Sequence, residues 1–386
     1  MPDRLLDAFI IGTGSYLPNA PVGNDRIEHV LGSINGVPSR IRRLVLQRNG
    51  IESRHYAIDP ETRRQTHDNA ALTAEALRIA AAAAGVAIER LGALSCGTSS
   101  PDQLQPGHAL MVHGALKLPP LEVMTASGIC CSGVTALKHA LLTIRCGDAK
   151  LAGASGSELV SNLFHAEHYG AELASRRVGD DDPMIGFEAE FLRWMLSDGA
   201  GAVMLADQPR SDGGLSLRVD WIDTWSFAGE FDACMYAGAK KNSDGRLTGW
   251  REVDSDTWLR DGYFNLTQDV KLLRKHISEV TIGRALPMVI DRRQLVPESI
   301  DWFLPHFSSF YFRPEVTARL QQVGFVIPEE RWFTNLATAG NTGSASFFIM
   351  LDELLRSGRL KRGQRILGFV PESSRFAVGY LHLTVC

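Results

Sequence analysis

The sequence predicts a layered α/β protein made of two similar halves, and three observations support this class. Short apolar stretches typical of strands alternate with helical stretches along all 386 residues. Hydrophobic residues make up 45% of the chain, enough for a large buried core. One arrangement also occurs twice, namely a turn of small residues, an amphipathic helix, an Arg-x-Gly exit and a strand. We therefore expect an internal duplication, with halves at 1–210 and 211–386.

The first half opens with a strand and turn in "DAFIIGTGSYLP". An alanine-rich helix follows in "DNAALTAEALRIAAAAAGV", where an Asp or Asn caps the start and Gly85 ends the helix. Two strands are predicted in "LGALSCGTSS" and "LEVMTAS", and a helix from Ser132 to about Arg145. Two more strands come from "KLAGASGSEL" and "GAGAVMLAD".

The second half repeats a similar order. It contains a strand in "GLSLRVDWIDTW", a helix in "LTQDVKLLRKHISEVTIGRAL", a strand in "DWFLPHF" and a helix in "PEVTARLQQVGF". The stretch "NTGSASFFIMLDELLRSGRLKRGQRILGFV" predicts a helix and a strand, and "AVGYLHLTV" predicts the last strand.

Composition excludes several classes of protein. The formal net charge of −4 gives no global basic field for binding nucleic acid. "MPDRLLDAFIIGTG" is unlike a signal or transit peptide, and no run approaches the roughly 18 apolar residues of a membrane span. We therefore expect a cytoplasmic protein. Six cysteines are few for a disulfide framework, and none has zinc spacing, so no metal site is expected.

Two adjacent cysteines, Cys130 and Cys131, stand where a predicted strand gives way to a predicted helix. Free N–H groups and the positive end of a helix dipole stabilise a thiolate at such a junction. Gly128 and Gly133 permit a tight turn there. The alternative is that both thiols are small buried hydrophobic side chains, as free cysteines often are.

Two further polar residues follow the same pattern in the second half. His306 comes just after an apolar strand, at the end where sites in α/β sheets usually lie. Asn341 stands at the start of a helix, in the position of the repeat that matches the cysteine turn. A lone His is more often structural and a lone Asn is usually a cap, but three such residues at corresponding strand ends indicate an active site.

Seven segments in order resemble the thiolase-fold condensing enzymes of the β-ketoacyl-acyl-carrier-protein synthase III type. They are "IIGTGSYLP", "NGIESRHYA", "CSGVTAL", "SDGAGAVML", "DWFLPH", "GNTGSAS" and "LLRSGRLKRGQRIL". The resemblance implies a five-layered α-β-α-β-α core built from two βαβαβαββ halves. It places the nucleophile in the first half and the His and Asn in the second, and it implies a homodimer.

The resemblance also implies the residue roles. Cys131 would take an acyl group from a thioester, and Cys130 stands where the family usually has alanine. His306 and Asn341 would hydrogen-bond the carbonyl oxygen of a second thioester while its α-carbon becomes a carbanion. Asp198 matches a structural turn. No metal or redox cofactor is required, since the substrates are carried as phosphopantetheine or coenzyme A thioesters.

Departures from the family concern the substrate entrance. The usual "PHQAN" is "PHFSS", which puts Phe307 and Ser309 at the pantetheine entrance. Leu44 replaces an aromatic residue that stacks on the adenine of coenzyme A, although Arg48 is kept. This change favours an acyl carrier protein as donor.

Nearby arginines could meet a carrier protein's acidic helix and phosphate, namely Arg40, Arg42 and Arg43. A solvated basic face is the alternative reading. In the loop "SSPDQLQPGHAL", which in this family closes the partner subunit's acyl tunnel, Gln105 replaces a common aromatic residue. A smaller gate is compatible with longer acyl chains.

The family's Gly-rich oxyanion turn is replaced by "GFVPESSRFAVGY". Pro371 has no N–H to donate, so the donor to the oxyanion would have to be Ser373 or a neighbour. Glu372 is a candidate base for removing an α-proton, with a surface ion pair to Arg375 as the alternative.

The "PESSRF" loop and "LGSINGVPSRIRRLVLQRNGI" resemble the subgroup that forms dialkylresorcinol and cyclohexanedione precursors. These enzymes join an acyl unit to a 3-oxoacyl thioester and close a ring, and a separate aromatase follows. Three alternatives stay open: a decarboxylating synthase III that uses malonyl-carrier protein, a cysteine hydrolase, and a degenerate partner subunit.

Overall fold

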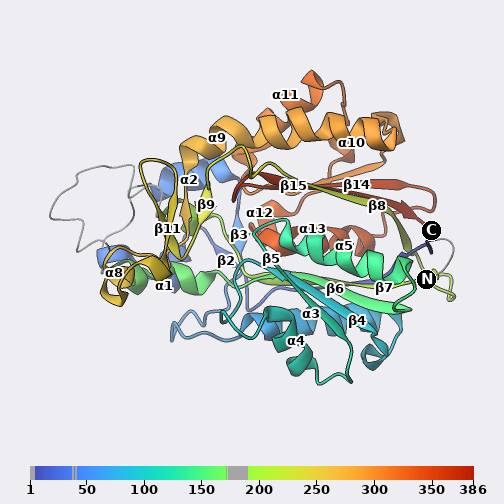
Figure 1. Cartoon of the computed structure of the whole chain (residues 1–386), viewed down its shortest axis with the longest axis horizontal. Helices are drawn as coiled ribbons and strands as arrows, with labels where there is room; N and C mark the ends of the chain where they lie inside the picture. Colours follow the sequence, from blue (N-terminus) through green and yellow to red (C-terminus); the bar gives the residue numbers. More distant parts are fainter. Residues whose placement is uncertain (1–4, 37–38, 40, 171, 173–189) are drawn as a thin grey trace.

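A computed structural model describes residues 5–36, 39, 41–170, 172 and 190–386. Figure 1 shows five layers. Helices α3 (Asn69–Ala84) and α4 (His108–Leu116) cover one outer face, and α9 (Val270–Ser278), α10 (Ala285–Arg293) and α11 (Arg313–Gln322) cover the other. Helices α5 (Ser132–Arg145) and α13 (Ser346–Arg356) lie in the middle, between two groups of strands. The predicted five-layered α/β architecture is confirmed.

Among the described residues, nine strands join in one sheet of order β13-β14-β15-β8-β1-β7-β6-β4-β5. The first group is β1 (Phe9–Tyr16), β4 (Ala93–Thr98), β5 (Glu122–Ser127), β6 (Leu151–Glu158) and β7 (Gly199–Ala206). The second is β8 (Leu217–Ser226), β13 (Trp302–Pro305), β14 (Arg365–Glu372) and β15 (Ala377–Val385). In the described part of the chain, the two groups are joined by the pairing of Phe9 and Ile10 of β1 with Arg218 and Leu217 of β8. Pairs β4–β5, β4–β6 and β13–β14 are parallel.

Both groups place their strands in the same order. In the first, the third strand in sequence, β5, lies beyond the second, β4, at the edge of the sheet. In the second group the corresponding edge position is held by Trp332, which forms an isolated parallel bridge with Phe303 of β13. The repeated order is what a duplication would produce, while the division into two domains at residue 210 stays a prediction.

Helix α3 illustrates how closely the sequence patterns predict the elements. Asp68 caps its start by accepting a hydrogen bond from the Ala71 N–H at 2.6 Å, and Gly85 ends it with a φ of 68°. The predicted limits of α5, Ser132 and Arg145, are also those observed.

Two glycines bring the halves into contact at the start of α5. A Cβ on Gly133 would lie 2.4 Å from the Ser344 carbonyl oxygen, and a Cβ on Gly156 of β6 would lie 2.2 Å from it. Only glycine permits this approach. The turn that carries the cysteines therefore packs directly against the turn that follows Asn341.

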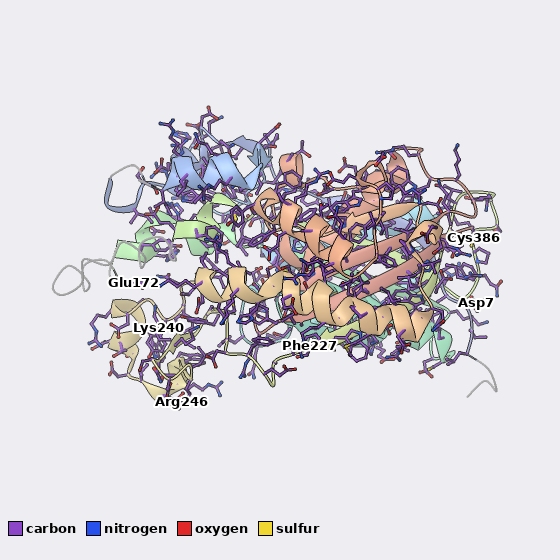
Figure 2. All side chains as sticks on the ribbon, turned by 90° about the horizontal axis from the view of Figure 1, so that it is seen from above. Asp7, Glu172, Phe227, Lys240, Arg246 and Cys386 are labelled. Carbon is purple, nitrogen blue, oxygen red and sulfur yellow. The ribbon has the colours of Figure 1, made fainter. Side chains whose placement is uncertain are left out.

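The segment 227–268, here called the insertion, was not predicted. It lies between β8 and α9 and contains β9 (Met235–Tyr236), β10 (Ala239–Lys241), β11 (Leu247–Gly249), α8 (Ser255–Arg260) and β12 (Thr267–Gln268). Figure 2 places Lys240 and Arg246 at the end of the molecule away from Asp7 and Cys386. Lys240 forms an ion pair there with Glu172, at 3.3 Å.

The remaining short elements precede α3 or lead to α13. They are β2 (Val22–Gly23), α1 (Ile27–Leu31), α2 (Arg42–Asn49), β3 (Ser53–Arg54) and α12 (Leu336–Ala339), and a π-helical turn (Glu279–Arg284) joins α9 to α10. Within the described residues, no helix combines the length and the apolar character needed to span a membrane.

Candidate active site

An apolar cavity lies between the two halves, and several predicted residues line it together. Cys130, His306, Phe307, Asn341, Pro371 and Ser373 are all on its wall. The rest of the wall is mainly apolar and comes from residues 191–196, the insertion, α9 and α11, for example Leu192, Met195, Met235, Leu266, Ile277 and Val316. Such a cavity suits a hydrocarbon chain with a reacting group at one end.

The two thiols face different surroundings. Cys131 caps the start of α5, as predicted, but its side chain is buried, with Sγ donating to the Val370 carbonyl oxygen at 3.2 Å. Cys130 lies on the cavity wall, whereas Cys131 is not among the wall residues. The assignment of Cys131 as nucleophile stays a prediction, and its Sγ must turn away from Val370 to reach a substrate.

The expected lowering of the thiol pKa is wrong for this arrangement. Burial, with the Glu372 carboxylate as the next cause, raises the pKa of Cys131 well above its usual value. Burial followed by Glu372 and Glu158 does the same for Cys130. The local effect of a helix N-terminus is outweighed by desolvation of the thiolate and by these negative charges. A proton acceptor is therefore needed when the thiol reacts.

Glu372 binds the backbone around the cysteine turn. Its Oε2 accepts from the N–H groups of Cys131 at 2.8 Å and Ile129 at 3.2 Å, and its Oε1 accepts from the Ser374 hydroxyl at 2.5 Å. Pro371 and Ser373 line the cavity but Glu372 does not, because successive side chains of a strand point to opposite faces. Its contacts are backbone and hydroxyl groups, and the alternative ion pair to Arg375 is not formed.

In the family that the chain resembles, the N–H of the nucleophile and an N–H of the Gly-rich turn form the oxyanion hole. Here the Cys131 N–H already donates to Glu372, and Pro371 has no N–H. Ser373 lies on the cavity wall, and its hydroxyl donates to the Gln268 side chain at 3.2 Å. Its service as an oxyanion donor stays a prediction.

His306 is held as a neutral imidazole that faces the cavity. Its backbone N–H donates to the Phe369 carbonyl at 2.8 Å, and Nε2 is buried with no hydrogen-bond partner among the described residues. Burial lowers the pKa of His306 to about 4. Nε2 is therefore available to bind a substrate oxygen.

Asn341 is fixed by its neighbours. Its Oδ1 accepts from the Gly343 N–H at 3.0 Å, its backbone N–H donates to Met195 and its carbonyl accepts from Ser197. Since Oδ1 is occupied, the amide Nδ2 is the group left to donate to a substrate on the cavity wall. Asn341 and His306 line the same cavity, and their joint binding of one carbonyl oxygen stays a prediction.

The His306 environment predicts a pH dependence of stability. The unfolded chain binds a proton on this residue below about pH 6.5, whereas the folded chain does not until about pH 4. The free energy of unfolding should therefore fall as pH falls from 6.5 to 4. Urea unfolding at pH 7 and pH 5 should show a smaller fall in His306→Gln than in wild type. If the free energy of unfolding fell as much in His306→Gln as in wild type, His306 would not be buried in its neutral state. His108→Gln should also reduce the fall, because burial lowers the pKa of His108 to about 4 as well.

A basic mouth opens beside the cavity and shares Phe191, Met195 and Phe312 with its wall. The predicted Leu44, Arg48 and Ser309 line it, together with Lys271, Arg274, Lys275 and Tyr311. The α9 cations were missed because their presence in the sequence does not reveal which surface they face.

Four predicted residues lie elsewhere or cannot be placed. Arg42 and Arg43 of α2 line a separate hollow with Asn24 and Ser39. Arg40 lies outside the described residues. Gln105 is exposed and is not on the cavity wall of its own chain, so its role toward a partner subunit stays a prediction.

Glu158 was also missed. It is the last residue of β6, is buried and lies on the cavity wall with Cys130, His306 and Asn341. A signal was present in the sequence, since an acidic residue ends the strand predicted in "KLAGASGSEL", at the same sheet edge as the other site residues. Asp198, by contrast, is structural as expected: it accepts from the N–H groups of Ala57, Val160 and Ser161.

Comparisons with known proteins identify similar condensing enzymes. Residues 290–370, which include His306 and Asn341, match the family described as 3-oxoacyl-[acyl-carrier-protein (ACP)] synthase III C terminal. β-Ketoacyl-[acyl-carrier-protein] synthase III of Rhizorhabdus wittichii is 27% identical over 366 residues, covering 93% of this chain and 94% of that protein. The Clostridium perfringens enzyme is 26% identical and covers 94% of both chains. The chain is a condensing enzyme of the acyltransferase type, similar to synthase III.

Solved structures agree on the fold. The tetronic acid condensing enzyme AbyA1 matches with a TM-score of 0.76 and 21% identity over 98% of this chain and 99% of that one. OleA of Xanthomonas campestris, solved with lauric acid and lauroyl-CoA, matches with a TM-score of 0.72 and 20% identity over 98% and 99%. Synthase III of Pseudomonas aeruginosa matches with a TM-score of 0.70 and 23% identity over 98% of both. These matches confirm the thiolase-like fold.

Proposed function

We propose that this condensing enzyme joins an acyl group held on Cys131 to a 3-oxoacyl thioester and that the product closes toward a dialkylresorcinol precursor. The observation that carries the proposal is the cavity wall, where the free Nε2 of His306 and the amide of Asn341 stand beside the cysteine turn. Two neutral donors at one carbonyl oxygen stabilise an enolate.

The reaction runs in two stages. The cysteine sulfur first attacks the donor thioester, the donor's carbon–sulfur bond breaks, and the thiol proton leaves with the pantetheine sulfur. A second thioester then loses an α-proton, and its enolate oxygen is bound by His306 and Asn341. The enolate carbon attacks the enzyme-bound acyl carbon, a carbon–carbon bond forms, and the cysteine sulfur leaves and is reprotonated.

Proton removal, rather than decarboxylation, is favoured by the substrate chemistry and by the loop sequence. The methylene of a 3-oxoacyl thioester lies between two carbonyls and is already acidic, so a carboxylate near the reacting carbon can remove its proton. The segments "PESSRF" and "LGSINGVPSRIRRLVLQRNGI" resemble the resorcinol-forming subgroup. A separate aromatase would act on the product. The curated relatives favour the other candidate, a decarboxylating synthase III.

Carrier-protein docking at the basic mouth gives a second prediction. Lys271→Glu combined with Lys275→Glu should raise KM for an acyl-carrier protein about tenfold or more at low salt and leave kcat nearly unchanged, since surface charges mainly steer association. The effect should shrink with added salt. Steady-state kinetics with a carrier-protein thioester and a small N-acetylcysteamine thioester would measure this change. Lys361→Glu, on an exposed lysine that does not line the mouth, is the matched control. Equal losses with both donors would contradict carrier docking.

Product analysis tests the proposed reaction. The enzyme is supplied with octanoyl-carrier protein and then with either 3-oxooctanoyl- or malonyl-carrier protein. We expect a coupled or cyclised product from the first pair without release of carbon dioxide. Coupling only with malonyl-carrier protein and release of carbon dioxide would instead assign a chain-initiating synthase III, and free octanoic acid alone would assign a hydrolase. The proposed homodimer is tested separately: the mass of the purified enzyme in solution should be twice that of one chain.

A further inference from the structure

We infer that Glu158 is the base that removes the α-proton of the second thioester, in place of Glu372. The inference rests on the proposed function, because only a non-decarboxylating condensation needs this proton to be removed. It begins from two carboxylates near the cysteine turn, of which Glu158 lines the cavity and Glu372 does not.

Glu372 does not line the cavity. Its two oxygens bind the N–H groups of Ile129 and Cys131 and the hydroxyl of Ser374, and it is not among the cavity-wall residues. A base must come within hydrogen-bond reach of the proton that it removes. Glu372 therefore supports the cysteine turn and does not reach the reacting carbon.

Glu158, unlike Glu372, lines the cavity in which the second thioester would react. It lies on the cavity wall with His306 and Asn341, which bind the enolate oxygen in the proposed reaction. A Cβ on Gly343, two residues after Asn341, would lie 2.9 Å from both Cγ and Oε1 of Glu158. The carboxylate therefore packs against the turn that carries the enolate-binding amide.

The cradle around Glu158 holds it in one position without neutralising it. Oε2 accepts from the hydroxyls of Ser99 at 2.6 Å and Ser100 at 2.7 Å, and Oε1 accepts from the N–H groups of Ser99 at 3.3 Å and Ser344 at 3.2 Å. These donors are neutral. Burial raises the pKa of this carboxyl, and the serine groups oppose the rise. A base of raised pKa binds an abstracted proton more strongly than an exposed glutamate does.

The proton can be followed through one cycle. The bond between the α-carbon and its hydrogen breaks, the proton passes to Glu158, and the electron pair moves into the enolate bound by His306 and Asn341. The enolate carbon forms the new carbon–carbon bond, and the cysteine sulfur leaves the acyl carbon. Glu158 returns its proton to this sulfur, so the thiol and the carboxylate are both restored. The negative charge of Glu158 also raises the pKa of Cys130, which places it near the cysteine turn.

The test separates loading from condensation in single turnovers. Each enzyme is incubated with octanoyl-carrier protein, its adduct is measured by intact mass, and 3-oxooctanoyl-carrier protein is then mixed in. Glu158→Gln should form the adduct as wild type does and discharge it at least about a hundredfold more slowly, the usual contribution of a general base. Glu158→Asp should recover part of the rate. Asp352→Asn is the matched control, because Asp352 is another buried carboxylate, bound by the hydroxyls of Thr13 and Ser15 away from the cavity.

Several results would overturn the inference. Condensation by Glu158→Gln at the wild-type rate would exclude it. If both Glu158 variants fail to form the adduct, Glu158 is a structural residue and the inference is wrong. If Glu372→Gln loads normally but fails to condense while Glu158→Gln condenses, Glu372 is the base. A wild-type enzyme that loads but never forms a carbon–carbon bond would instead reject the proposed function, so the two failures can be told apart.

Discussion

Replacement of Cys131 by alanine is expected to abolish the acyl adduct and all product, whereas Cys130→Ala is expected to keep both. Cys131 directly precedes α5 in the segment "CSGVTAL", where the resemblance places the nucleophile. The loss should exceed about a thousandfold, since no other group would carry the acyl chain. Intact mass after incubation with octanoyl-carrier protein measures the adduct directly.

The positions of the two thiols relative to the cavity make the comparison of the two variants informative. Cys130 already lies on the wall, and Cys131 must rotate its Sγ away from the Val370 carbonyl to reach it. An adduct in Cys131→Ala that is absent in Cys130→Ala would transfer the nucleophile role to Cys130. Cys146→Ala, at the other end of α5, is the control for nonspecific loss of a thiol.

Removal of either enolate donor should have the next largest effect. His306→Ala and Asn341→Ala are each expected to form the adduct normally and to slow its discharge about a hundredfold to a thousandfold, which is typical for loss of one such donor. The neutral Nε2 of His306 and the Nδ2 of Asn341 act only when the second substrate becomes an enolate. Rapid-mixing single turnovers of preloaded enzyme measure this step separately from loading.

Loss of loading in these variants would contradict the assigned step. If His306→Ala failed to form the adduct, His306 would be the base for the thiol, as a cysteine hydrolase requires. His139→Gln is the matched control, because this half-buried histidine on α5 bonds Ser95 at 2.9 Å and does not line the cavity.

Local patterns predicted the elements well where the physical cause is local. The limits of α5 and the caps of α3 follow from neighbouring residues, and both are observed as predicted. The pKa of the Cys131 thiol could not be predicted from neighbouring residues. The helix terminus is local, but Glu372, which helps to raise the thiol pKa, is 241 residues away in the sequence.

The site residues that sequence reasoning missed depend on packing between the halves. Glu158 becomes a candidate base only because β6 meets the turn after Asn341, and its partner Ser344 is 186 residues away in sequence. The α9 cations join Arg48 in one mouth only in the folded chain. Helix limits and caps are properties of single segments, whereas these juxtapositions are properties of the whole fold.

The central claim is that this enzyme forms a carbon–carbon bond from a cysteine-bound acyl group, and one measurement tests it most directly. Wild-type enzyme is loaded with carbon-13-labelled octanoate from its carrier protein, freed of excess donor and mixed with unlabelled 3-oxooctanoyl-carrier protein. We predict that the adduct mass disappears and that the label is recovered bonded to the unlabelled chain. Recovery of the label only as free octanoic acid would contradict the account.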